Sequence, residues 1–474
     1  MLTYTVPFVI NGEERQADST FDVKSPDTGK LLHRCGIATE ADVVAAIEAA
    51  AAAGQQWANT PAAERRDILL KAADIMDKRR DELAQYMMDE VAAARGWADF
   101  NLNLVIDMYK DVAGRVSAVE GTIPPCQSGL TSIVVKEPYG VVLAIAPWNA
   151  TYILGTRSVL FPIAAGNTVV FKGSETAPRA HHAIVSILSE AGVPKGVVNY
   201  IVTDPAHAPS VTEALVANPI VKKINFTGST GVGRIIAKLA GQYLKPVVLE
   251  LGGKAPAIVW EDANLDLAAE QTTLGAFFFS GQICMSTERI IVHKKISEAF
   301  QEKLLGTVEK FFSSKGDALV LINAQGVDKN KKLIKDAVSK GASVLNGDVD
   351  VKEGSKTRMR PLVISKVTPD MDLYKQESFG PSVSLIEVES EEEALRVAND
   401  TEYGLTSAVF TEDLRVGLRF ARGIESGAVH INNMTIHDEM TLPHGGVKAS
   451  GHGRFNSLPG VEEWVRTKTI TWRN

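Results

Sequence analysis

The sequence predicts an α/β protein with two doubly wound domains and a small β arm. Three observations lead to this prediction. Short apolar runs alternate with helical stretches, this alternation occurs once before and once after Leu251, and two extended segments belong to neither series. Parallel strands covered by helices on both faces are buried on both sides, which produces such apolar runs. With 474 residues, 45% of them hydrophobic, the chain is long enough for more than one core.

The first hundred residues are expected to be helical. Pro61 suits the first position of a helix that Thr60 would cap, and apolar residues from Ile68 to Leu83 recur at helical spacing. We therefore expect this region to be a scaffold.

The first α/β series contains five apolar runs of strand length, separated by helical stretches. Ligands of doubly wound sheets bind at the carboxyl ends of the strands, so functional residues are expected just after each run. The runs are residues 141–146, 168–171, 197–202, 223–226 and 247–249.

The second series has strand-like residues 289–292, 382–386, 407–410 and 428–431, and helical residues 296–312 and 391–398. The segments 120–136 and 467–472 read as extended arms outside both series. Strands outside a core expose unpaired edges, so we expect the arms to pair with each other and with a second subunit.

Charge and cysteine content narrow the class of partner. The chain has 57 acidic and 50 basic residues without a long block of either sign, which argues against nucleic-acid or membrane binding. The longest apolar runs, such as residues 141–148, are too short to cross a bilayer. Three cysteines cannot form a disulfide framework and suit a reducing compartment. We predict a cytoplasmic protein that binds a small molecule and has no metal site.

A glycine-containing loop at residues 227–233 joins a strand to a helix and contains Gly228, Ser229 and Gly233. Free backbone N–H groups and the helix dipole make such a loop an anion site. The spacing is not that of the common dinucleotide or triphosphate motifs, so a plain structural turn is the alternative.

Lys172 and Glu175 follow another predicted strand. Placed there, they could hold ribose hydroxyls, and the carboxylate would repel a 2′-phosphate and favour NAD over NADP. By themselves, they fit a solvated charged turn better.

Cys284 lies in residues 277–289, a helix-like segment that ends in a polar turn. Most buried cysteines act as small hydrophobic residues, and Cys35 and Cys126 keep that interpretation. Glu250 ends an apolar strand and precedes paired glycines, where a carboxylate is costly to bury without a purpose. It could be a general base or part of a salt bridge with a nearby lysine.

Asn149 belongs to residues 147–149, which directly follow the first strand of the series. Its amide could donate a hydrogen bond to a developing oxyanion. Local hydrogen bonding within a turn is the alternative.

Six motifs together resemble the aldehyde dehydrogenase superfamily, in the order and at the spacing found in that family. The resemblance spans nearly the whole chain. The motifs are residues 147–149, 226–230, 250–254, 281–284, 377–381 and 443–448.

The resemblance implies a domain layout. A Rossmann-like NAD-binding domain would comprise residues 1–119 and 138–249, and a catalytic domain residues 250–456. Residues 120–137 and 457–474 would form the oligomerisation arm of a homodimer or homotetramer.

The resemblance also implies roles for individual residues. Cys284 would be the nucleophile, Glu250 the general base, and Asn149 with the Cys284 backbone N–H the oxyanion hole. NAD would be the cofactor. The residues expected to bind it are Ile145, Ala146, Pro147, Trp148, Lys172, Glu175, Gly228, Ser229, Gly233, Leu251, Glu377 and Phe379.

Residues 282–289, 250–256 and 442–453 resemble the branch of the family that oxidises salicylaldehyde, vanillin and benzaldehyde. Many relatives carry aromatic residues where Ala150, Arg157 and His444 stand, which implies a wider, partly polar pocket for a hydroxylated ring. The expected substrate residues are Trp97, Ala150, Ile153, Leu154, Arg157, Phe278, Ile283, Met285, His437 and His444.

Two of these residues have an alternative interpretation. Arg157 could contact a ring hydroxyl, or it could pair with a carboxylate inside the subunit. Trp97 could form a pocket wall, or it could simply pack in the core.

The predicted reaction is oxidation of an aromatic aldehyde to its acid through a thiohemiacetal and a thioester on Cys284, which water activated by Glu250 hydrolyses. Oxidation of an aliphatic aldehyde or semialdehyde is the alternative within the family. Two further alternatives are a non-redox thiol esterase and a catalytically silent structural protein.

Overall fold

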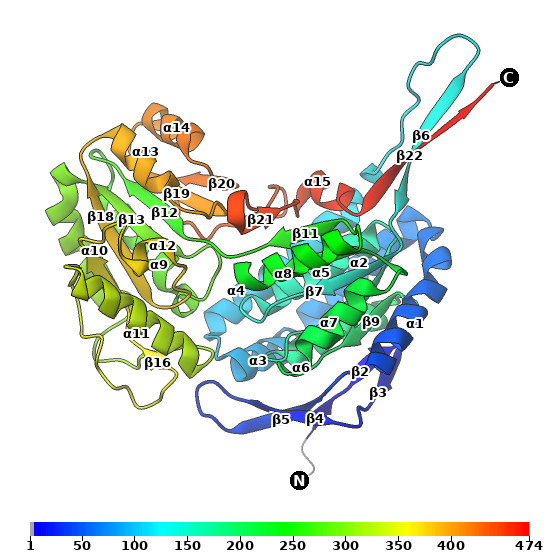
Figure 1. Cartoon of the computed structure of the whole chain (residues 1–474), viewed down its shortest axis with the longest axis horizontal. Helices are drawn as coiled ribbons and strands as arrows, with labels where there is room; N and C mark the ends of the chain where they lie inside the picture. Colours follow the sequence, from blue (N-terminus) through cyan, green and yellow to red (C-terminus); the bar gives the residue numbers. More distant parts are fainter. Residues whose placement is uncertain (1–3, 474) are drawn as a thin grey trace.

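The computed structural model describes residues 4–473 and contains two large sheets, each flanked by helices, from which a two-stranded arm projects (Figure 1). The predicted α/β class, with two sheet-based halves and a small β arm, is confirmed. Residues 1–3 and 474, the ends of the predicted NAD-binding domain and arm, lie outside the described residues.

The first sheet has eight strands in the order β21-β11-β10-β7-β8-β9-β2-β3. Its five central strands are parallel and confirm the five predicted runs, whereas the edge strands are antiparallel. The central strands are β7 (Val141–Ile145), β8 (Thr168–Lys172), β9 (Val198–Ile201), β10 (Val221–Thr227) and β11 (Val247–Glu250), and the edge strands are β2 (Phe8–Ile10), β3 (Glu13–Arg15) and β21 (Gly451–His452).

Helices bury the central strands of this sheet, which explains their continuous apolar sequence. Four helices alternate with the strands, and four precede them in the chain. The first group is α5 (Thr151–Ala164), α6 (Pro178–Ala191), α7 (Ala208–Ala217) and α8 (Thr230–Gln242), and the second is α1 (Glu40–Ala58), α2 (Ala62–Lys78), α3 (Arg80–Val91) and α4 (Arg95–Arg115).

The expectation that the first hundred residues are helical is wrong for the segment before α1. Short strands occupy it, and Asn11 and Gly12 form the turn between β2 and β3 with φ of 55° and 70°. An Asn-Gly pair favours such a hairpin because both residues tolerate positive φ. The remaining strands, β1 (Thr5–Val6), β4 (Thr20–Lys24) and β5 (Leu31–Gly36), form a separate three-stranded sheet.

The predicted cap at Thr60 is also wrong. Pro61 is the N-cap of α2 and provides no side-chain hydrogen bond. The Thr60 hydroxyl instead donates to the carbonyl of Gln56 at 3.1 Å, at the end of the preceding helix. Threonine commonly makes such backward bonds, which compete with capping.

The second sheet has seven strands in the order β15-β17-β18-β13-β12-β19-β20. All but β15 are parallel, and the four predicted strands are confirmed, while β12, β15 and β17 were not predicted. The strands are β12 (Ala255–Val259), β13 (Thr287–His293), β15 (Ser343–Val344), β17 (Leu362–Ser365), β18 (Ser382–Val388), β19 (Thr406–Phe410) and β20 (Ala428–Ile431).

Two apolar clusters cover the faces of this sheet. Helices α9 (Leu265–Phe277) and α10 (Ser297–Phe311) pack on one face, and α11 (Ala324–Ser339), α13 (Glu391–Asn399) and α14 (Leu414–Gly423) on the other. The remaining small elements are α12 (Asp372–Lys375), β14 (Leu319–Val320) and β16 (Arg358–Met359).

The arm consists of β6 (Thr131–Pro138) and β22 (Val465–Trp472), which follows α15 (Ser457–Glu462). The strands are antiparallel and paired from Val465 opposite Pro138 to Trp472 opposite Thr131. The prediction that the two arms pair with each other is therefore confirmed, and Figure 1 shows them extending away from the rest of the molecule.

The parallel strands of the first sheet end at one common edge. Ile145 lies opposite Lys172 and Phe226, and Thr227 lies opposite Glu250. The turns that follow these strands are therefore neighbours in space.

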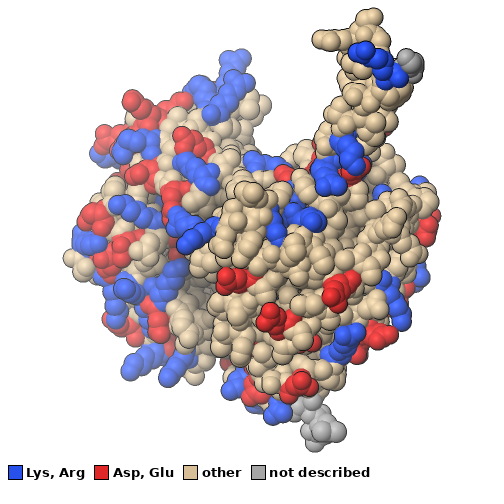
Figure 2. All heavy atoms as spheres, turned by 45° about the vertical axis from the view of Figure 1, so that its right-hand side comes forward, with Lys and Arg blue, Asp and Glu red and all other residues tan. Residues whose placement is uncertain are grey.

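Acidic and basic side chains are interspersed over the face of the molecule in Figure 2. None of the helices within residues 4–473 is both long enough and apolar enough to span a membrane.

Candidate active site

Cys284 lies in a loop between η2 (Phe278–Gly281) and β13. Helix α9 stops at Phe277 because Phe279, Ser280 and Gly281 have φ of 46°, 61° and 71°. The expected continuation of helix toward Cys284 is thus wrong. A side chain at Gly281 would collide with the carbonyl of Gly380, so the turn requires glycine there.

Glu250, the last residue of β11, faces this cysteine. Its Oε1 lies 3.9 Å from Cys284 Sγ and 3.0 Å from His444 Nε2. Its Oε2 lies 3.6 Å from Arg157 Nη1 and makes no hydrogen bond within residues 4–473. The lysine partner considered from the sequence is absent from this group, because Lys254 pairs with Glu288.

Arg157 is fully buried on α5 and forms an ion pair with Asp438. Asp438 also accepts a 2.7 Å hydrogen bond from Asn456 Nδ2. Of the two interpretations of Arg157, the structure therefore shows pairing with a carboxylate inside the subunit. Asp438 was not predicted, since nothing in its sequence neighbourhood distinguishes it from a surface aspartate.

Burial raises the pKa of the Cys284 thiol well above its usual value, and the carboxylates of Glu250 and Glu377 raise it further. Burial also raises the pKa of Glu250, but His444 and Arg157 together bring it below its ordinary value. The site therefore holds a neutral thiol beside an ionised carboxylate, and a base is needed to form the thiolate.

Asn149 lies between β7 and α5. Its side-chain Nδ2 donates to the Gln282 carbonyl at 3.0 Å, and its backbone carbonyl accepts from Trp97 Nε1 at 3.0 Å. These bonds fix Asn149 beside the Cys284 loop and leave the second N–H of its side-chain amide free. The backbone N–H of Cys284 makes no hydrogen bond within the described residues, so both predicted oxyanion donors are available.

A cleft of about 260 Å³ lies between the two sheets. The turns after β7, β10 and β11 line one side, and residues preceding β13 and β18 line the other. Seven predicted cofactor residues line it, together with the unpredicted Thr227, Gly252 and Lys329. The seven are Pro147, Trp148, Gly228, Ser229, Leu251, Glu377 and Phe379.

Five other predicted cofactor residues lie outside the lining of this cleft: Ile145, Ala146, Lys172, Glu175 and Gly233. Ile145 and Ala146 are buried beneath it, and a Cβ at Gly233 would collide with the side chain of Leu251. Gly233 thus allows the first turn of α8 to approach β11.

The local chemistry fits a dinucleotide. Ser229 caps α8 by accepting a 3.4 Å bond from the Val232 N–H, so the helix N-terminus opens onto the cleft. Lys172 ends β8 as a buried ammonium without a hydrogen bond among residues 4–473, and burial lowers its pKa while Glu175 opposes this. The buried cation near the Glu175 carboxylate suits ribose hydroxyls, and the N-terminus of α8 suits phosphate groups.

Glu377 and Phe379 lie on the opposite wall. The Glu377 carboxylate accepts a 2.9 Å bond from the Gly253 N–H, and burial together with Glu288 raises its pKa to about 7. Phe379 has φ of 51° and its ring meets Trp148 edge-on, with centroids 6.0 Å apart.

A second, apolar cavity of about 20 Å³ adjoins Cys284. Seven predicted substrate residues line it, and so do Asn149, Glu250 and the unpredicted Phe100, Leu104 and Asp438. Phe100 and Leu104 share a face of α4 with Trp97, a spacing that could have identified them. The seven are Trp97, Ala150, Ile153, Leu154, Arg157, Ile283 and Met285.

The other three predicted substrate residues do not line this cavity. Phe278 packs edge-on against Trp97 at 5.1 Å, His437 pairs with Glu439, and His444 bonds Glu250. Trp97 both forms a wall and holds the Asn149 loop, so its two interpretations coexist.

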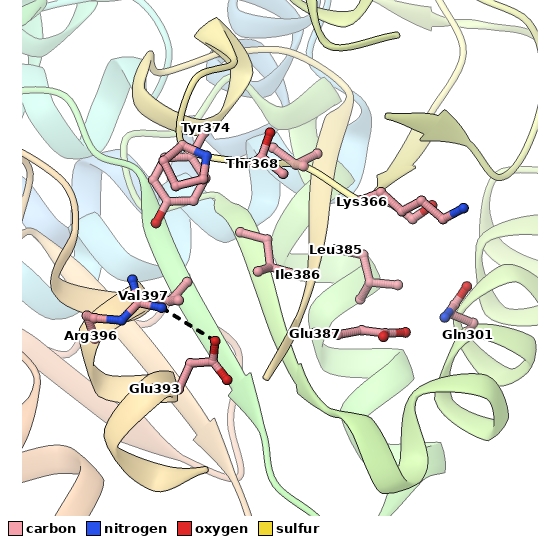
Figure 3. Close-up of a pocket in the computed structure, with 13 residues that line it drawn as sticks. Gln301, Lys366, Thr368, Tyr374, Leu385, Ile386, Glu387, Glu393, Arg396 and Val397 are labelled. Carbon is pink, nitrogen blue, oxygen red and sulfur yellow. Dashed lines mark hydrogen bonds and ion pairs between the residues drawn. The ribbon is translucent and has the colours of Figure 1, made fainter. Parts of the chain in front are cut away.

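A cavity of about 400 Å³ lies elsewhere, beside the carboxyl ends of β17 and β18 (Figure 3). Its charged residues include Lys366, Glu387 and a 3.4 Å pair of Arg396 with Glu393. No cysteine or histidine lines it, so we place the active site at the Cys284 cleft. Within residues 4–473, no group of His, Cys, Asp or Glu side chains is arranged to hold a metal ion.

Comparison with known proteins agrees with this geometry. Residues 13–470 match the aldehyde dehydrogenase family. The vanillin dehydrogenase of Pseudomonas sp. (strain HR199) is 43% identical over 99% of this chain and 98% of its own length.

Two solved structures superpose on nearly the whole chain, and in each case 99% of this chain and 98% of the other are covered. The salicylaldehyde dehydrogenase of Pseudomonas putida G7, complexed with salicylaldehyde, is 36% identical with a TM-score of 0.95. The succinate-semialdehyde dehydrogenase of Burkholderia pseudomallei is 36% identical with a TM-score of 0.94. This chain therefore belongs to the aldehyde dehydrogenase family.

Proposed function

We propose that this aldehyde dehydrogenase uses NAD to oxidise a hydroxylated aromatic aldehyde to the carboxylic acid. One observation carries the proposal: Cys284 Sγ and Glu250 Oε1, 3.9 Å apart, lie where the cleft meets the apolar cavity, and Asn149 lines both spaces. A nucleophile, a base and an oxyanion donor thus share one point between a cofactor-sized cleft and an apolar pocket.

The first step needs Cys284, Glu250 and Asn149. An aldehyde carbon does not release hydride until a nucleophile adds to it. Glu250 accepts the thiol proton, the sulfur bonds to the carbonyl carbon, and the carbonyl electron pair moves onto oxygen. The free N–H of Asn149 and the Cys284 backbone N–H stabilise the resulting alkoxide.

NAD would be held by Lys172, Glu175 and the 228–229 turn on one side and by Glu377 and Phe379 on the other. When bound, it supplies a positively charged ring that accepts the hydride released as the alkoxide collapses to a thioester. The carboxylate of Glu175 would repel a 2′-phosphate, which favours NAD over NADP.

Hydrolysis of the thioester again uses Glu250. After Glu250 has released the thiol proton to solvent, its carboxylate accepts a proton from water while the water oxygen bonds to the acyl carbon. The C–S bond then breaks, the acid leaves, and sulfur departs as the thiolate, which takes the proton back from Glu250. The lowered pKa of Glu250 keeps the base ionised between turnovers.

The aromatic substrate class is supported by the cavity wall. Trp97 and Phe100 stack with ring centroids 5.3 Å apart, and Phe278, which does not itself line the cavity, meets Trp97 edge-on. The vanillin and salicylaldehyde dehydrogenases among the similar proteins point the same way. A cavity of about 20 Å³ holds little more than one water, so ring entry requires these side chains to rotate.

The semialdehyde alternative is less well supported. A substrate carboxylate needs an unpaired cation in the pocket, and the cation that lines this pocket, Arg157, is already paired with Asp438. An aldehyde panel tests this alternative directly.

We also propose that the arm joins subunits into a homodimer or homotetramer. It exposes apolar side chains, namely Ile123 in the segment before β6 and Ile470 and Trp472 on β22. Light scattering against the 51.0 kDa chain mass measures the number of subunits.

The test of the function is NADH formation over aromatic and aliphatic aldehydes, with NAD and with NADP. We expect turnover of hydroxylated benzaldehydes with NAD, and a loss of at least about a thousandfold in Cys284→Ala. Cys126→Ala, at an exposed cysteine, is the matched control and should match the wild type. Absence of NADH with every aldehyde, or full activity in Cys284→Ala, would refute the proposal.

A further inference from the structure

His444 makes the shortest hydrogen bond to Glu250 in the site. Its Nε2 lies 3.0 Å from Oε1, the oxygen that also faces Cys284 Sγ. The imidazole side chain is only 9% exposed, and two backbone bonds to Phe455, of 2.9 and 2.8 Å, fix its position. The ring is therefore held on the carboxylate and does not line the substrate cavity.

We propose that His444 is a positioning residue: its Nε2–H bond to Oε1 holds the Glu250 carboxylate in the orientation that faces Cys284. This inference rests on the proposed function, in which Glu250 is the base. It assigns to His444 a role different from that of a substrate residue, which the resemblance implied.

The other carboxylate oxygen has no comparable restraint. Glu250 Oε2 lacks a hydrogen bond among the described residues, and Arg157 Nη1 is 3.6 Å away. Arg157 is itself held by Asp438 and lies over the Phe455 ring at 5.5 Å. Oε2 is thus free to accept a proton from water, while the hydrogen bond at Oε1 fixes the orientation of the carboxylate.

The charges around Glu250 give its hydrogen bond with His444 a measurable effect on the pKa of Glu250. Charged or titratable groups face Glu250 from each neighbouring element: Arg157 on α5, Cys284 before β13, and Asp438 and His444 after β20. Burial raises the pKa of Glu250 and is the largest influence. His444 and then Arg157 lower this pKa, and Asp438 raises it. Removing His444 removes the largest lowering influence, so the pKa of Glu250 should rise.

The experiment compares His444→Phe and His444→Gln in steady-state NADH formation from an aromatic aldehyde over a range of pH. Phe fills the space without a donor, whereas Gln places an amide N–H near the position of Nε2. We expect kcat at neutral pH to fall about tenfold in His444→Phe and its acid limb to move to higher pH. His444→Gln should restore most of both, and KM for the aldehyde should stay within about twofold, because the ring lies outside the cavity.

The matched control is His452→Phe, at an exposed histidine of β21 whose backbone pairs with Leu249 beside Glu250. Its profile should overlay the wild type. If His444→Phe does not fold, His444→Leu replaces it, with the thermal midpoint as the check on folding.

Three outcomes would overturn the inference. The His444→Phe profile could coincide with the wild type, His444→Gln could be as impaired as His444→Phe, or KM could rise while kcat stays constant, as for a tunnel wall. Failure of the proposed function is distinguishable, because wild-type enzyme would then form no NADH or Glu250→Gln would be fully active.

Discussion

The two halves of the molecule contribute to the site from opposite ends of their strands. In the first sheet, Asn149, the 228–229 turn and Glu250 lie at or just after the carboxyl ends of β7, β10 and β11. In the second sheet, Cys284 precedes β13, and Glu377 and Phe379 precede β18, so these residues lie at the amino ends. The carboxyl ends of β17 and β18 instead border the large cavity of Figure 3.

This difference shows that the rule for ligand binding in α/β sheets applies to one half of the molecule and not to the other. Ligands of open α/β sheets bind at carboxyl ends because helix N-termini and short turns gather there. The second sheet meets the cleft with its opposite edge, so its contribution depends on how the two halves dock. Strand alternation within one half contains no information about that docking.

Apart from the loss expected in Cys284→Ala, the largest effect is expected from the first half. Asn149→Ala removes a side-chain donor that the structure fixes beside Cys284 through Gln282. Losing one oxyanion donor should lower kcat about a hundredfold, with KM little changed, measured as NADH formation from an aromatic aldehyde. An unaffected kcat would show that the carboxyl end of β7 does not contribute to the reaction, and the comparison of the two halves would fail.

The matched control for this variant is Asn103→Ala. Asn103 is an exposed asparagine on α4 whose side chain accepts a 2.8 Å bond from Arg80. Its activity should equal that of the wild type, because it touches neither cavity.

The fold could be predicted where the sequence pattern was strong. The strands from β7 to β11 are buried on both faces, so their apolar runs are continuous and bounded by helices. The strands before residue 37 are two to six residues long; β2 is buried, β3 is exposed throughout, and the others are partly exposed. Such short edge strands bury too little to show a period, and the Asn11-Gly12 turn was their main signal.

Most residues that meet at the candidate site could be predicted, but not all of their contacts. Cys284, Glu250 and Asn149 stood out because a resemblance to a family named them, and the structure brings them together. Asp438 and the His444 bond to Glu250 depend on a loop after β20 that folds back over the site, which no local pattern encodes. His437 and Phe278, expected in the pocket, pack beside it instead.

An intermediate effect is expected at the amino edge of the second sheet. The pKa of Glu377 is about 7 in the folded protein against 4.5 for the ordinary side chain. The folded state therefore holds this proton more tightly than the unfolded state, so stability is lost as pH rises from about 4.5 through 7. Glu377→Gln stays neutral and should not incur this loss.

The measurement is the thermal midpoint of cofactor-free protein at pH 5 and pH 8. We expect Glu377→Gln to equal the wild type at pH 5 and to exceed it by about 2–5 °C at pH 8. Glu402→Gln, at an exposed carboxylate, is the control and should show no such pH-dependent gain. A difference of equal size at both pH values would show that packing, and not ionisation, is responsible.

The smallest effect is expected at the carboxyl edge of the second sheet. Arg396 borders the large cavity with its side chain 62% exposed and a single 3.4 Å bond to Glu393 (Figure 3). Surface pairs of this kind contribute little, so Arg396→Gln should change kcat/KM by less than about twofold and the free energy of unfolding by less than about 0.5 kcal/mol. Arg396 lines neither the Cys284 cleft nor the apolar cavity. A tenfold loss of activity would therefore mean that the second sheet serves the reaction from both ends. The division of labour between the two halves would then have to be abandoned.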